Sequence, residues 1–355
     1  MADDSITLYP SNWLYNAGVI GFLRVLEKCG QEVENLLMDE GIVKIKLNSV
    51  NEEDIFSKWD ELSPKSSKGK SLFYGSKTSY YANQTENSIR TRIKKLLNTE
   101  KNNIKLRKGS LVLYCYFCGN AELTTKSKAI FLNQAFSNVL LASEKTFPNL
   151  YWNNQSNTFI CSKCEFLIMS HHLSLTKLSD SSEIFINAPS FKLMWYLNKY
   201  ASEILNKRKT YQLKEILGIS FIELAQKVFT TLGAWSMGNI EMVIKNKDVI
   251  KNKDSIDYYS LPYEISKVLL NKEVASLISQ TNEEFILQII LDGKFDKLLT
   301  LNQKILRYAI TNSGAYDDKY LSKLRNKDPY SLKKLSTILP ELYVKIDNIL
   351  KRGEV

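Results

Sequence analysis

The segment LYCYFCGN, residues 113–120, contains Cys115 and Cys118 three positions apart, the second directly before a glycine. A second pair, Cys161 and Cys164, follows in TFICSKCEF, and each pair comes after an apolar, strand-like run. A C-x-x-C turn holds two sulfurs close together, and two such turns supply the four thiolates of a tetrahedral zinc site. The spacing therefore predicts one structural Zn²⁺ bound by all four cysteines.

Two other interpretations of the four cysteines stay open, namely a redox or iron–sulfur role and cysteines buried without a ligand. A thioredoxin-like motif requires one C-x-x-C beside a βαβ pattern, which this sequence lacks. The pairs are separated by 42 residues, more than the about 15–20 of a compact zinc ribbon. Residues 119–160 are therefore expected to be an insertion, with a helix in KAIFLNQAFSNVLLAS. Cys29 has no nearby partner, and His171 and His172 are expected to serve local structure rather than to replace a sulfur.

The rest of the chain predicts a mixed first half and a helical second half. Residues 11–28 follow helical spacing, with Ser11 as the expected cap and Gly18 and Gly21 spaced for close packing. GIVKIKL, residues 41–47, alternates like a strand with one wet face. Amphipathic segments expected to be helices cover 191–207, 212–232, 262–280, 283–291, 298–311 and 331–351. The polar stretch 244–262, with IKNKD twice, is expected to be a surface connection.

The expected fold class is therefore α+β, with a mixed amino-terminal domain, an inserted four-cysteine zinc-ribbon-like module and a mainly helical carboxy-terminal domain. Residues 1–110 are predicted to form the α+β amino-terminal part with a basic segment. Residues 111–188 are predicted to form the zinc module with its helical insertion, and residues 189–355 a helical bundle.

Positive charge is concentrated in one part of the chain. The sequence carries 48 Lys and Arg against 38 Asp and Glu, a net charge of +10. Residues 61–110 hold 12 of these basic residues and 3 of the acidic ones, so this segment alone carries +9. A clustered excess of this kind fits binding to nucleic acid, with a merely solvated basic surface as the plain alternative.

The basic segment offers candidate DNA contacts of three kinds. Cations in the expected helix ENSIRTRIKKLLN and in the loop before it are candidates for phosphate oxygens. The amides of Asn83 and Gln84 are candidates for base edges, and Tyr80 and Tyr81 for stacking or wedging, although each also fits ordinary turn chemistry. The full candidate set is Lys65, Lys68, Lys70, Lys77, Tyr80, Tyr81, Asn83, Gln84, Arg90, Arg92, Lys94 and Lys95.

No pattern in the sequence indicates catalysis, and we expect a protein that is not an enzyme. A site closed by four thiolates leaves no open position for water. The GKS at 69–71 lacks the glycine of a P-loop, since Pro64 stands there, and no G-x-S-x-G or H-E-x-x-H occurs. The first residues lack the features of a secretory signal, and no apolar run approaches the about 18 residues of a membrane span. We therefore expect a soluble, cytoplasmic protein.

The opening LYPSNWLYNAGVIGFLRVLE, residues 8–27, the basic middle segment, and the pairs CYFC and CSKC, in this order, resemble the CRISPR-associated CxxC–CxxC family. Residues 8–170 carry the recognisable features. The resemblance implies the large subunit of type I-B Cascade, an RNA-guided surveillance complex, with the four cysteines as structural zinc ligands.

The resemblance further implies that this subunit is non-catalytic and binds near the 5′ end of the guide RNA. It also implies that the subunit recognises the protospacer-adjacent motif on target double-stranded DNA and helps to open the target. The implied partners are guide RNA, duplex DNA, the backbone and guide-end-binding subunits, a small helical subunit and a recruited helicase-nuclease, with no membrane. The alternative is a zinc-ribbon nucleic-acid-binding protein outside CRISPR defence. A metal-dependent nuclease is a third interpretation, but no ligand cluster for it is visible in the sequence.

Overall fold

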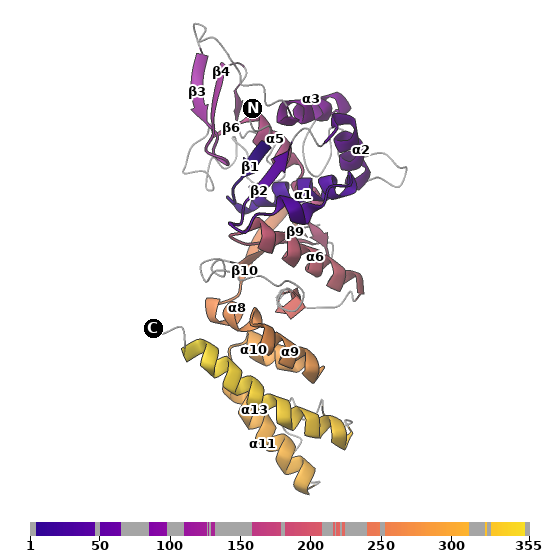
Figure 1. Ribbon diagram of the computed structural model, residues 1–355, viewed down its shortest axis with the longest axis vertical. Coiled ribbons are helices and arrows are strands. Elements are labelled where there is room, and N and C mark those ends of the chain that lie inside the picture. Colours follow the sequence, from indigo (N-terminus) through magenta and orange to yellow (C-terminus); the bar gives the residue numbers. More distant parts are fainter. Residues whose placement is uncertain are drawn as a thin grey trace. The chain divides into compact units, whose positions relative to one another are not determined.

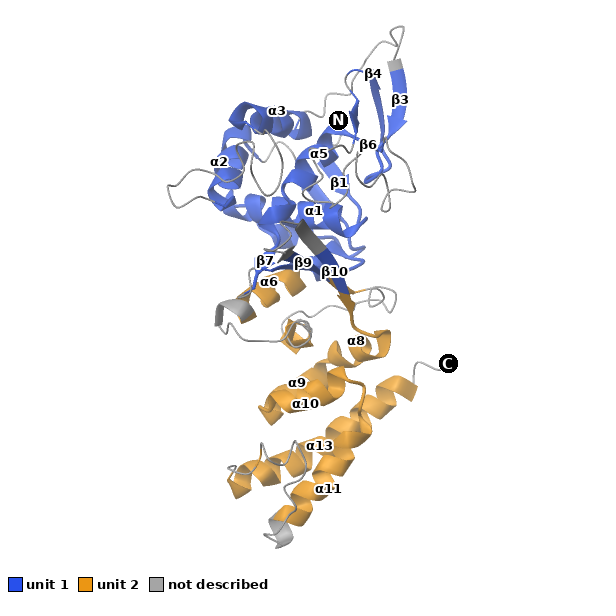
Figure 2. Cartoon of the chain, turned by 180° about the vertical axis from the view of Figure 1, so that it is seen from behind, with its two compact units in different colours: residues 1–195, 243–258 blue, residues 196–242, 259–355 orange. Residues whose placement is uncertain are grey.

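The chain folds into two compact units, coloured separately in Figure 2. Unit 1 is residues 1–195 and 243–258, and unit 2 is residues 196–242 and 259–355. The computed structural model describes residues 5–46, 50–64, 85–97, 110–125, 127, 129–131, 158–178, 182–207, 216, 218–220, 222–223, 240–248, 253–311, 324 and 328–351. Within these ranges no helix is both long enough and apolar enough to cross a membrane.

The first half of the chain contains both short strands and helices (Figure 1). In chain order its elements are β1 (Ser5–Leu8), α1 (Trp13–Lys28), the 3₁₀ turn η1 (Val33–Leu36), β2 (Val43–Lys46), α2 (Glu52–Leu62), α3 (Glu86–Leu97), β3 (Ser110–Tyr114), β4 (Ala121–Thr125), β5 (Ile130–Phe131), β6 (Phe159–Ile160), α5 (Ser162–Met169), the 3₁₀ turn η4 (His171–Leu173), β7 (Thr176–Lys177) and β8 (Glu183–Asn187).

The second half is mainly helical. Its elements are α6 (Phe191–Lys207), β9 (Glu241–Asp248), β10 (Lys253–Ser260), α8 (Tyr263–Leu269), α9 (Lys272–Thr281), α10 (Glu284–Leu291), α11 (Asp296–Thr311) and α13 (Pro329–Lys351). In unit 2, α13 packs along α11 and α9. The α+β class with a four-cysteine cluster and a helical carboxy-terminal region is thereby confirmed. The predicted boundaries after residues 110 and 188 stay predictions.

The described strands form four small sheets. β1 pairs with β2, β3 with β4 and β5 with β6, each pair antiparallel, and the largest sheet has the order β10-β9-β8-β7. The prediction of a surface connection over 244–262 is therefore wrong, because this stretch contributes β9 and β10. The expected helix beginning at Lys128 is also wrong at its start, since Ile130 and Phe131 form β5 and pair with β6. The rest of that expected helix, residues 132–143, lies outside the described residues.

Helix α1 is the central element of unit 1. Its cap is Asn12, whose side chain accepts a hydrogen bond from the Tyr15 backbone N–H, and not Ser11 as the sequence predicted. Ser11 instead donates its backbone N–H to Asn16 Oδ1 at 2.8 Å. Nearly every residue from Leu14 to Leu26 is buried, so α1 has neighbours on almost all sides. A helix that is apolar around most of its circumference is a core helix.

Two glycines let α1 approach the backbone of α5 and η4. A Cβ built on Gly18 would lie 2.7 Å from the carbonyl carbon of Leu167, and closer still to its oxygen. A Cβ built on Gly21 would lie 2.9 Å from the carbonyl carbon of Ser170. Only glycine permits contacts this close, so the predicted use of this spacing for packing is confirmed. The contact also fixes α5, which follows the second cysteine turn.

The adjacent histidines belong to this same core. His171 Nδ1 donates to Ile168 O and His172 Nδ1 donates to Met169 O, each at 2.9 Å. Burial lowers the pKa of His172 to about 3 and holds the pKa of His171 well below its usual value. Both rings are therefore neutral at physiological pH, and among the described residues the candidate metal cluster contains neither of them.

Candidate metal centre

The first cysteine turn closes the end of strand β3. Cys115 donates its backbone N–H to Asn120 O at 2.9 Å, and Gly119 donates its N–H to Cys115 O at 2.9 Å. Gly119 has a φ of +69°, a left-handed conformation that glycine adopts without strain. The chain reverses here into β4, which brings Cys118 back beside Cys115.

The second cysteine turn joins β6 to α5. Cys161 occupies the N-cap position of α5, where its Sγ accepts a hydrogen bond from the Cys164 N–H at 3.4 Å. The two turns are held together by the backbone, because Tyr116 donates its N–H to Phe159 O at 3.0 Å. Glu122 of β4 adds a second link by accepting from the Ser162 N–H at 3.0 Å. Both turns therefore present their sulfurs to the same point.

The four sulfurs meet the requirements of a tetrahedral thiolate site. The Sγ atoms of Cys115, Cys118, Cys161 and Cys164 all lie within 4.8 Å of one another, and Cys118 and Cys161 are 3.7 Å apart. Four sulfurs bound about 2.3 Å from one zinc ion would be about 3.8 Å from each other. The donor set is soft, closed and largely buried, as in structural rather than catalytic sites. The residues present thus fit a structural metal.

The electrostatics of the cluster also favour a cation. Hydrogen bonds from Cys118 and the other thiols lower the pKa of Cys115 far below its usual value. The same network raises the pKa of Cys164, chiefly because its proton is shared with Cys115. The pKa of Cys118 is also lowered and the pKa of Cys161 is raised, so Cys161 and Cys164 hold their protons more strongly than free thiols do. Those protons must leave when a metal binds, so metal affinity falls as the pH falls.

An ion pair connects the metal centre to helix α3. Arg92 Nε donates to Glu165 Oε1 at 2.7 Å, and Arg92 also donates to Ser88 O. The two charged side chains are only 19% and 8% exposed, so the pair is largely removed from water. Glu165 directly follows the ligand Cys164 in α5. Arg92, a predicted phosphate contact, therefore holds α3 against the metal module in this structure.

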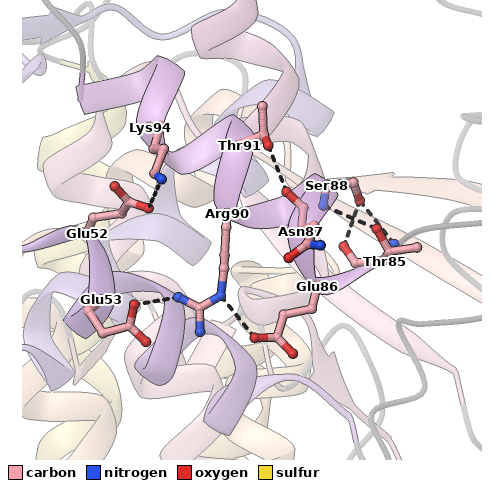
Figure 3. Close-up of polar contacts among 9 residues, drawn as sticks. All are labelled: Glu52, Glu53, Thr85, Glu86, Asn87, Ser88, Arg90, Thr91 and Lys94. Atoms are coloured by element: carbon pink, nitrogen blue, oxygen red, sulfur yellow. Dashed lines mark hydrogen bonds and ion pairs between the residues drawn. The ribbon is translucent and has the colours of Figure 1, made fainter.

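Arg90 is held by two carboxylates, as Figure 3 shows. Its guanidinium binds Glu53 of α2 and, at 2.9 Å, Glu86 of α3. It also lies 3.7 Å above the ring of Phe56, a cation–π contact. The two hydrogen bonds to carboxylates raise the pKa of Arg90 above its usual value. This cation thus joins α2 to α3.

The two lysines that follow on α3 are more accessible. Lys94 lies 3.6 Å from Glu52, a longer ion pair whose lysine side chain is 64% exposed (Figure 3). Lys95 is exposed and has no ion-pair partner within the described part of the chain. The assignment of DNA contacts to α3 stays a prediction, and Lys95 is the cation that the structure leaves most available for it.

The remaining candidates for DNA contacts lie outside the described residues. They are Lys65, Lys68, Lys70, Lys77, Tyr80, Tyr81, Asn83 and Gln84. The chain between α2 and α3 contains all of them, and its flanking helices are joined by the ion pairs of Arg90 and Lys94.

The structure also shows positioning residues that the sequence did not indicate. Glu122 binds the amino end of α5, and Glu165 binds Arg92 behind the cysteine turn. Both are ordinary acidic residues in the sequence, and their partners lie 40 and 73 positions away. No local spacing could have found them.

The geometry defines a class of protein: a mixed α/β chain with a four-cysteine cluster suited to a structural metal. A family model described as CRISPR-associated protein (Cas_CXXC_CXXC) matches residues 110–176, which contain both cysteine turns. This part of the chain is thus similar to a CRISPR-associated CxxC family, and the match supports a CRISPR-related role. No curated protein matches the chain.

Proposed function

We propose that this protein is the non-catalytic large subunit of an RNA-guided type I-B CRISPR surveillance complex in the cytoplasm. In this role it recognises the protospacer-adjacent motif on duplex DNA and helps to open the target for a separate helicase-nuclease. The observation that carries the proposal is the match of residues 110–176 to the CRISPR-associated family, over a stretch that brings four cysteines into one cluster.

The structure supports a scaffolding role for the metal centre in this proposal. A closed four-thiolate site has no position for a substrate or an activated water, so a Zn²⁺ bound there would stabilise the fold. The Arg92–Glu165 pair then fixes α3 to the second cysteine turn. Helix α3 directly follows the Lys-rich stretch 65–84, so the metal centre holds the helical part of the basic segment.

The basic segment supplies the proposed contact with nucleic acid. In RNA-guided complexes base pairing reads most of the sequence, while the protein reads a short duplex tag and holds the backbone by charge. The exposed Lys95, with Lys65, Lys68, Lys70 and Lys77, is proposed to bind phosphates in this way. Arg92 is proposed to act through the position of α3 rather than by touching DNA.

Copurification from the native host tests the proposed role. The tagged chain is expected to bring down a guide RNA of uniform length together with backbone subunits of the complex, and sequencing of the RNA identifies its origin. Recovery of heterogeneous RNA or DNA without those subunits would favour the alternative, a zinc-ribbon nucleic-acid-binding protein outside CRISPR defence. Recovery of no nucleic acid would contradict both.

Substitutions of two neighbouring cations on α3 should have different effects. In the assembled complex, Lys95→Gln is expected to reduce the slope of log affinity against log salt for duplex DNA by about one, because one phosphate contact is lost. It should leave the free energy of unfolding unchanged within about 0.5 kcal/mol, as for most surface substitutions. Salt-dependent binding and urea unfolding of the variant measure the two effects.

Arg92→Gln is expected to do the reverse. It leaves Glu165 largely buried without its partner, which destabilises unit 1 by about 2–3 kcal/mol. The double variant Arg92→Gln with Glu165→Gln should recover part of this loss, since no unpaired charge remains. An unchanged salt slope in Lys95→Gln would remove Lys95 from the proposed contacts. A normal stability in Arg92→Gln would show that the ion pair does not fix α3.

A further inference from the structure

The hydroxyl of Tyr15 is buried, and its ring lies against the first cysteine turn. Tyr15 lies in the first turn of α1 and is 0% exposed. Its Oη has no hydrogen-bond partner among the described residues. A buried hydroxyl left unpaired in this way destabilises a protein by about 1–3 kcal/mol, and native structures contain few of them. Tyr15 Oη is therefore expected to have a hydrogen-bond acceptor in the native protein.

The ring of Tyr15 is fixed against the first cysteine turn. It stacks on Phe117 with ring centroids 6.0 Å apart and planes at 11°. Phe117 stands between Cys115 and Cys118 in the sequence, so the stack brings α1 to the sulfur cluster. Burial raises the pKa of Tyr15 well above its usual value, and the charges of the four cysteines raise it further, Cys164 most strongly among them. The phenol therefore keeps its proton at physiological pH.

Thiolates of the adjoining cysteine cluster are acceptors with the right chemistry. A thiol sulfur accepts hydrogen bonds weakly, whereas a thiolate is anionic and accepts a stronger, charge-assisted bond. Metal binding converts all four sulfurs of the cluster to thiolates at once. The acceptor that Tyr15 Oη lacks is thus one that the loaded centre would supply.

We propose that Tyr15 Oη donates a hydrogen bond to a thiolate sulfur of the metal-loaded centre and so ties helix α1 to the cysteine cluster. This inference rests on the proposed metal site. Tyr15 is a positioning residue here, since it acts through a ligand and does not bind the metal. Because α1 also packs on α5 through Gly18, the helix then contacts both halves of the centre.

The substitution Tyr15→Phe tests the inference because it removes Oη and keeps the ring on Phe117. Outer-shell partners of metal ligands typically contribute about 10- to 100-fold to affinity. Zinc affinity, measured by competition with a chromogenic chelator, is expected to fall by at least about tenfold. In the cobalt-substituted protein the thiolate-to-metal charge-transfer band is expected to move to lower energy, because the sulfur electrons lose a stabilising donor. Tyr200→Phe, a buried tyrosine in unit 2, is the matched control.

The possible results distinguish the metal centre from the hydrogen bond of Tyr15. If the wild-type protein binds no stoichiometric zinc or cobalt, the metal centre itself is contradicted. If the wild type binds metal and Tyr15→Phe shows the same affinity and band position, the tyrosine inference is overturned while the centre stands. A weaker affinity without a band shift also overturns it, since that is the result of a purely packing role. Should Tyr15→Phe fold poorly, 3,5-difluorotyrosine at position 15, a stronger donor, should move the band to higher energy, and no shift would contradict the hydrogen bond.

Discussion

Cys164→Ser is expected to abolish stoichiometric metal binding and to destabilise unit 1 by several kcal/mol. The Cys164 side chain is 1% exposed, and its sulfur is one of the four that lie within 4.8 Å of one another. Structural zinc sites contribute about 10–16 kcal/mol of apparent binding free energy at pH 7, and a serine hydroxyl is a poor replacement for a thiolate. Metal content and urea unfolding of the variant, each with and without a chelator, measure the effect.

Cys29→Ser is the matched control for this experiment. Cys29 is the fifth cysteine and the C-cap residue of α1, half-buried and outside the sulfur cluster. Its substitution is expected to leave the metal content unchanged and the stability within about 0.5–1 kcal/mol of wild type. If Cys164→Ser and Cys29→Ser unfold alike, and a chelator affects neither, the cluster does not stabilise the fold through a metal.

Gly18→Ala is the second substitution with a large expected effect. In an ordinary helix interior this change stabilises by about 0.5–1 kcal/mol. Here the added Cβ would lie 2.7 Å from the Leu167 carbonyl carbon, and backbone atoms cannot move aside as a flexible side chain does. Helices α1 and α5 must separate, which we expect to destabilise unit 1 by about 3 kcal/mol or more. The sign of the change in the free energy of unfolding shows whether helix propensity or packing against α5 dominates at this position.

Chemical unfolding of Gly18→Ala beside Lys28→Ala measures this prediction. Lys28 is exposed in the last turn of the same helix, so its replacement should change the stability by less than about 0.5 kcal/mol. A Gly18→Ala protein as stable as wild type would show that α1 and α5 do not pack as closely as the structure indicates.

The features predicted well from the sequence are those carried by local spacing. The two C-x-x-C motifs predicted which cysteines cluster, because each turn is closed by hydrogen bonds within itself. The amphipathic helices α10, α11 and α13 begin within two residues of their expected starts, since their apolar positions repeat along one face. The spacing of Gly18 and Gly21 likewise pointed to a close helix contact.

The features missed depend on partners far along the chain. The sequence predicts a surface connection over 244–262, yet β9 pairs with β8 and β10 pairs with β9. Arg92 belongs to the same run of cations as Arg90 and Lys95, and the ion pair with Glu165, 73 positions away, gives it a structural role. Asn12 rather than Ser11 caps α1, and the Ser11 N–H donates to Asn16 Oδ1. None of these contacts can be predicted from the spacing of apolar residues along the chain.

Metal analysis by native mass spectrometry tests the four-sulfur centre most directly. The protein, purified without added zinc, is expected to carry one zinc ion per chain, and Cys164→Ser is expected to carry none. A wild-type chain with intact thiols and no stoichiometric metal would contradict the proposed zinc centre, because the four clustered sulfurs would then bind no ion.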